Sequence, residues 1–64
     1  MPVIYLKSGG YIECEGYTIK DNCARAIGAV LKETEQLPES KKYAEAVIPL
    51  ANILFILPQQ LSNK

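Results

Sequence analysis

The length of the chain limits its fold more than any other feature of the sequence. Sixty-four residues form one domain, and a chain this short buries only roughly 60% of the surface that its unfolded form exposes. Yet 48% of the residues are hydrophobic and only 22% are charged. Because one small core cannot easily hide so many apolar side chains, we expect part of them to lie in an interface. The sequence therefore predicts a homo-oligomer.

Charge and cysteine content disfavour several classes of function. Seven basic residues balance seven acidic ones and are scattered along the chain, so the basic stripe of a nucleic-acid binder is missing and nucleic acid is an unlikely partner. The chain has no histidine, which removes the imidazole base of Ser-His and Cys-His pairs. Its two cysteines fall short of the roughly four ligands of a structural zinc site. We therefore predict a non-enzymatic protein without metal or cofactor.

The cellular setting predicted from the sequence is the cytoplasm. Met1 and Pro2 lead directly into an apolar segment, without the basic region that begins a secretory signal. The longest apolar stretch, residues 46–58, is interrupted and is shorter than the roughly 20 residues that span a bilayer. No membrane association is expected, and both thiols are expected to be reduced.

The N-terminal segment has the pattern of a β-hairpin. Residues 3–7 are rich in β-branched and aromatic side chains, residues 11–15 alternate apolar and acidic side chains, and Gly9 and Gly10 lie between them. Glycine supplies the positive φ of tight hairpin turns, so we predict a two-residue Gly9-Gly10 turn.

The register implied by that turn makes the first strand apolar on both faces. Tyr5 would lie opposite Cys14 on one face, and Ile4 and Leu6 would occupy the other. Because that second apolar face needs a cover, Ile4 and Leu6 are predicted interface residues.

Glycine 16 lies where the apolar alternation changes phase. Ile12 and Cys14 precede it at even positions, and Tyr17 and Ile19 follow it at odd positions. A one-residue β-bulge at Gly16 would place all four side chains on the same face of the sheet.

The central segment, residues 23–36, has apolar residues at helical spacing and polar residues on the far side. Asp21 or Asn22 would serve as the N-cap, and Leu37-Pro38 would end the helix.

The C-terminal third allows two interpretations. Residues 42–48 and 53–57 are strand-like and are separated by a turn over residues 49–52. The alternative is a helix over residues 40–57, kinked at Pro49. We favour strands, because an interior proline costs a helix about 3 kcal/mol.

Residues 47–56 (VIPLANILFI) resemble the strand, short helical turn and strand that end many Sm-like and SH3-like barrels. They also resemble the closing strands of LytTR-type DNA-binding domains. This resemblance implies a local shape and no function.

These elements together predict an α+β domain over residues 1–58. It would contain an N-terminal β-hairpin, one central α-helix and a C-terminal strand pair, arranged as a small sheet or as an Sm/SH3-like partial barrel with a helix. Residues 59–64 would form a polar tail.

The predicted ligand-binding residues are Tyr11, Tyr17, Lys20 and Arg25. The tyrosines offer a stacking face and a polar tip. Lys20 and Arg25 would lie near the first turn of the helix, where free amides and two cations favour an anion.

The predicted oligomer interface consists of apolar side chains from the first and last strands. Its members are Ile4, Leu6, Ile53, Phe55 and Leu57.

Two functions suit these features. One is a homo-oligomeric binding protein that captures a small, nucleotide-like anion or blocks a protein target. By size, such a protein resembles phage and mobile-element inhibitors of host defence. The other is a protein–protein module that pairs through a sheet edge. A DNA-binding regulator ranks below both, because the chain is neutral.

Overall fold

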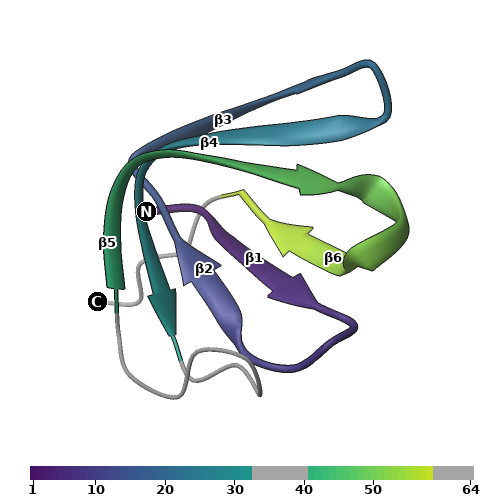
Figure 1. The fold of residues 1–64 in the computed structure, drawn as a ribbon, viewed down its shortest axis with the longest axis horizontal. Helices are drawn as coiled ribbons and strands as arrows, with labels where there is room; N and C mark the ends of the chain where they lie inside the picture. The colour runs from purple at the N-terminus through teal and green to yellow at the C-terminus, as the bar shows by residue number, and fades with distance from the viewer. Residues whose placement is uncertain (33–40, 59–64) are drawn as a thin grey trace, which may run out of the picture.

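The computed structural model of the protein describes residues 1–32 and 41–58. These residues form a single antiparallel sheet that curls into a half-barrel (Figure 1). Its elements are β1 (Val3–Leu6), β2 (Tyr11–Glu13), β3 (Gly16–Lys20), β4 (Cys23–Lys32), β5 (Lys41–Pro49), the 3-10 turn η1 (Leu50–Asn52) and β6 (Ile53–Leu57).

The predicted α+β class is wrong, because the segment expected to be the central helix is a strand. Residues 23–32 form β4, which pairs with β3 and β2 on one side and with β5 on the other. Residues 33–36 of the expected helix lie outside the described residues, as does the predicted tail at residues 59–64. Among the described residues only η1 is helical.

The turn before β4 explains why this segment is extended. Asp21 and Asn22 have φ values of 55° and 61°, and they join Lys20 to its ladder partner Cys23 in a two-residue hairpin. A type I′ turn needs positive φ at both central residues, and Asp and Asn tolerate that conformation well. The side chains expected to cap a helix instead occupy a hairpin turn.

Small residues on β4 let the sheet curl tightly around its core. Ala24, Ala26 and Ala29 are each at most 1% exposed. Alanine has a high intrinsic helix propensity, but here its small side chain lets neighbouring strands fold closely over the interior. The tertiary packing therefore overrides the local preference for a helix.

The N-terminal hairpin is present, but its register differs from the prediction. Ile4 pairs with Ile12 and Tyr5 with Tyr11, so the connection has four residues, 7–10, rather than two. This register places Ile4, Leu6 and Ile12 on one face, where each is at most 7% exposed. Burial of each such side chain contributes roughly 1.5–3 kcal/mol, which outweighs the preference for a tighter turn.

The alternation of buried and exposed residues shifts by one position between β2 and β3, and it shifts again at the facing position of β4. Ile12 and Cys14 are buried and Tyr17 packs against the core, as expected from the sequence, whereas Ile19 is 46% exposed. The pairing with β4 nevertheless keeps one register from Glu13↔Val30 to Gly16↔Ile27, so no residue is inserted at Gly16. The burial pattern of β4 shifts at the matching position, Gly28, where φ is +61°.

The C-terminal third consists of strands and a short helical turn, so the kinked-helix alternative is wrong for residues 41–57. The two strands do not pair with each other as a C-terminal unit, because β5 adds to β4 and β6 adds to β1. They lie at separate edges of the sheet, and η1 joins them (Figure 1).

Asn52 fixes this connection to the first hairpin. Its carbonyl accepts from the Lys7 amide at 2.7 Å, its Oδ1 accepts from the Ser8 amide at 3.1 Å, and its Nδ2 donates to Ser8 Oγ at 3.2 Å. The Leu50 amide donates to the Asn22 carbonyl at 2.9 Å, which ties η1 to the β3–β4 turn as well. These bonds set the position at which β6 begins.

Candidate functional site

Three aromatic residues form a continuous row across β2, β1 and β6, which we call the aromatic row: Tyr11, Tyr5 and Phe55. Tyr5 is the ladder partner of both Tyr11 and Phe55, so all three side chains lie on the same outer face. The ring centroids of Tyr5 and Tyr11 are 5.6 Å apart, and those of Tyr5 and Phe55 are 5.0 Å apart. These distances are typical of favourable tilted aromatic pairs.

The β6 end of this row carries three exposed apolar side chains. Leu54, Phe55 and Leu57 are 59%, 52% and 49% exposed. The β1–β6 register shifts between Tyr5 and Leu6, so Leu54 has no ladder partner on β1. Its side chain therefore does not follow the alternation between the core face and the outer face. We call these three residues the β6 patch.

A second candidate site, the basic hollow, lies on the face of β3, β4 and β5 opposite the core. It is a depression of about 390 Å³ lined by Thr18, Lys20, Asp21, Cys23, Arg25 and Val47. Thr18 pairs with Arg25 and Arg25 with Val47, so cross-strand register brings these side chains together.

The charge of the basic hollow is largely balanced. The guanidinium of Arg25 lies 2.7 Å from the Glu45 carboxylate, and Asp21 lines the hollow beside Lys20. A bound anion would compete with both carboxylates. No helix begins at Lys20 or Arg25, so the free helix amides expected to help an anion are absent from this place.

The structure separates the predicted ligand-binding residues. Lys20 and Arg25 meet in the basic hollow, and Tyr11 lies in the aromatic row on other strands. Tyr17 packs against the core from β3. One continuous ligand site containing all four residues is therefore not formed within a protomer.

The predicted interface residues also divide into two groups. Ile4 and Leu6 are core residues, 0% and 7% exposed, so they form no exposed face. Ile53 packs against the core from β6. Phe55 and Leu57 remain half-exposed and belong to the β6 patch.

Tyr5 and Leu54 are the surface residues that the sequence interpretation missed. A two-residue turn predicts Tyr5 opposite Cys14, whereas the four-residue connection places it beside Tyr11. Leu54 lies at a register shift that depends on β1 and β6 meeting, which no local pattern in residues 53–57 indicates.

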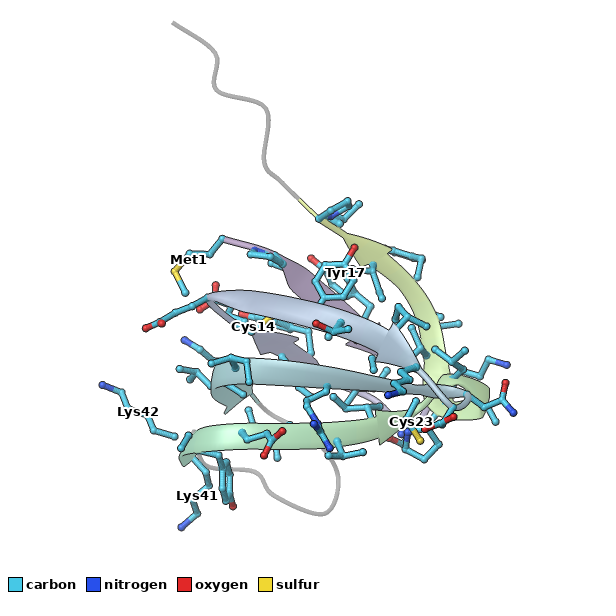
Figure 2. The ribbon with its side chains drawn as sticks, turned by 90° about the horizontal axis from the view of Figure 1, so that it is seen from above. Met1, Cys14, Tyr17, Cys23, Lys41 and Lys42 are labelled. Atoms are coloured by element: carbon cyan, nitrogen blue, oxygen red, sulfur yellow. The ribbon has the colours of Figure 1, made fainter. Side chains whose placement is uncertain are left out.

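The two cysteines are free thiols in different surroundings, and Figure 2 shows them at separate places in the sheet. Cys14 is buried, and desolvation raises the pKa of its thiol. Cys23 is partly exposed in the basic hollow. The Cys14 thiol thus behaves as a small core side chain.

Comparisons with known proteins found no relative of this chain. No protein-family model matches it, and no curated protein or solved structure matches it significantly. Within residues 1–32 and 41–58 there is no helix with the length and apolar character needed to cross a membrane.

Proposed function

We propose that the protein is a non-enzymatic, cytosolic binding protein that recognises another polypeptide through the aromatic row and the adjoining edge of β6. The observation that carries this proposal is the β6 patch, in which three large apolar side chains are about half exposed and one of them, Phe55, packs on Tyr5. Interfaces between proteins are enriched in Tyr and Phe and depleted of charge at their centres. The β6 patch and the neighbouring Tyr5 have that composition.

The free edge of β6 supports the same proposal. Among the described residues β6 pairs only with β1, so its second edge offers unpaired backbone amides and carbonyls. An extended segment of a partner could add to this edge through main-chain hydrogen bonds, while Phe55 and Leu57 contact its side chains.

Replacing Phe55 with glutamate tests the proposed function. We expect F55E to lose at least tenfold in affinity for any polypeptide that the wild-type protein captures, because a charge would be buried at the centre of the contact. Capture would be measured by pull-down from lysate of the source cells, followed by titration of the captured protein.

Ile27 provides a matched control for this substitution. It is 47% exposed, close to the 52% of Phe55, but lies on β4 away from the β6 patch. I27E is expected to bind like the wild type. Equal loss in both variants, or unchanged binding in F55E, would show that the β6 patch is not the recognition surface.

A second candidate function is capture of a small anion, and the observation that favours it is that Lys20 and Arg25 line the same hollow. If this site operates, phosphate or a mononucleotide should raise the melting temperature, and K20A and R25A should each remove the rise. E45Q should enlarge it, because Arg25 would be released from its 2.7 Å ion pair. Equal shifts in all four proteins would exclude this site.

A further inference from the structure

The edge strands β5 and β6 differ in whether they carry residues that prevent pairing with another strand. β5 carries Lys41 and Lys42 at its beginning, Glu45 in its middle and Pro49 at its end, and Figure 2 shows the two lysines projecting from one end of the strand. Charges and prolines on an edge strand disfavour the addition of another strand. β6 has the sequence ILFIL, with no charged residue, glycine or proline. β3, the other end strand, contains Gly16 and Lys20, so β6 is the edge strand that lacks such protection among the described residues.

The charge-free surface extends from β6 onto its neighbour. Val3 and Tyr5 of β1 are the ladder partners of Leu57 and Phe55, and they add two uncharged side chains to the same face. A partner for this surface must be apolar and uncharged along its own strand. The chain itself supplies such a strand in β6, and its net charge of zero creates no overall repulsion between two copies.

We propose that the partner seated on the β6 edge is a second copy of this chain, paired antiparallel through β6 about a two-fold axis. This inference rests on the proposed function, because it names the occupant of the same edge. A two-fold axis between antiparallel strands keeps corresponding faces on the same side of the joined sheet. Directly opposed residues must then point to the same face.

That requirement selects the register. Phe55 and Leu57 are exposed on the outer face, and Ile56 packs toward the core. An axis at Ile56 places Phe55 opposite the partner's Leu57, both on the outer face, and joins the two Ile56 side chains on the core face. An axis at Phe55 would instead oppose Leu57 to the partner's Ile53, which faces the core. Of these two registers, only the Ile56 register agrees with the observed faces.

Light scattering coupled to size exclusion tests the second copy directly. The wild-type protein is expected at twice the 7.1 kDa mass of one chain at micromolar concentration. F55K and L57E are each expected to be monomers, because each places an unpaired charge against an apolar side chain of the partner. V47E, altered at a 57% exposed residue on β5, should remain a dimer.

The double variant F55K/L57E tests the register. In the Ile56 register each new lysine lies opposite the partner's new glutamate, so the double variant is expected to recover the dimer that both single variants lose. Circular dichroism of each variant confirms that the monomers are folded. Salt should weaken the recovered dimer and leave the wild-type dimer unaffected.

Three outcomes would overturn this inference: a folded wild-type monomer at high micromolar concentration, dimers that persist in F55K and L57E, or a double variant that stays monomeric. A wild-type monomer that still captures another protein through Phe55 would leave the proposed function intact and remove only the second copy. A dimer disrupted by F55K in a protein that captures nothing else would show that self-pairing is the whole role of this edge.

Discussion

Replacing Ile4 with alanine is expected to remove most of the stability of the fold. Ile4 is fully buried at the centre of the core, between β2 and β6. Truncation of a buried isoleucine costs about 2–5 kcal/mol through lost burial and the cavity left behind. A single core in a domain of this size rarely supplies more than about 3–5 kcal/mol of stability, so this truncation removes most of it.

Urea unfolding followed by circular dichroism would measure this effect, with V47A as the matched control. Val47 is also a β-branched strand residue, but it is 57% exposed on β5. Its truncation should change the free energy of unfolding by no more than about 0.5 kcal/mol. If I4A and V47A had similar midpoints, the assignment of Ile4 to the core, and with it the register of the first hairpin, would be wrong.

Replacing Gly28 with valine is expected to destabilise the fold by about 1–3 kcal/mol, because its φ of +61° is strained for residues with a branched β-carbon. A β-carbon at this position would also lie 2.8 Å from Cδ of Glu15. The Glu15 side chain is exposed and can move aside, so the backbone conformation accounts for most of the cost. The midpoint of chemical unfolding measures it.

Gly16 supplies the comparison, since a β-carbon there meets nothing within 4 Å and its φ is not positive. G16V should therefore be tolerated, contrary to the interpretation of Gly16 as the special position. G28N should be less harmful than G28V, because asparagine adopts the left-handed region more readily. A greater loss of stability in G16V than in G28V would show that Gly28 is not the position that requires glycine.

The central segment shows why the fold class was not accessible from local patterns. Residues 23–32 contain alanines and spaced apolar side chains, which fit an amphipathic helix as well as a strand. Asp21 and Asn22 are equally suited to a helix N-cap and to a type I′ turn. The choice depends on β4 having strand neighbours on both sides, and those neighbours come from residues before and after it.

The candidate surfaces depended on tertiary structure for a related reason. The uncharged run at residues 53–57 predicts Phe55 and Leu57 as interface residues, but the alignment of Phe55 with Tyr5 requires β6 to pair with β1. Those strands are separated by most of the chain. The sequence predicts that Lys20 and Arg25 lie near the first turn of a helix, and in the structure they meet instead across the β3–β4 hairpin.

By itself, the sequence determined the features that depend on short-range chemistry. These are the strand character of residues 3–6, 42–48 and 53–57, the turn before Ile53, and the change of alternation near Gly16. Each arises from side-chain shape or backbone freedom within a few residues. The tertiary structure decided the register of the first hairpin, the extended state of β4 and the partners of β5 and β6. Those depend on which apolar faces can be buried together, and burial is a property of the whole chain rather than of any segment.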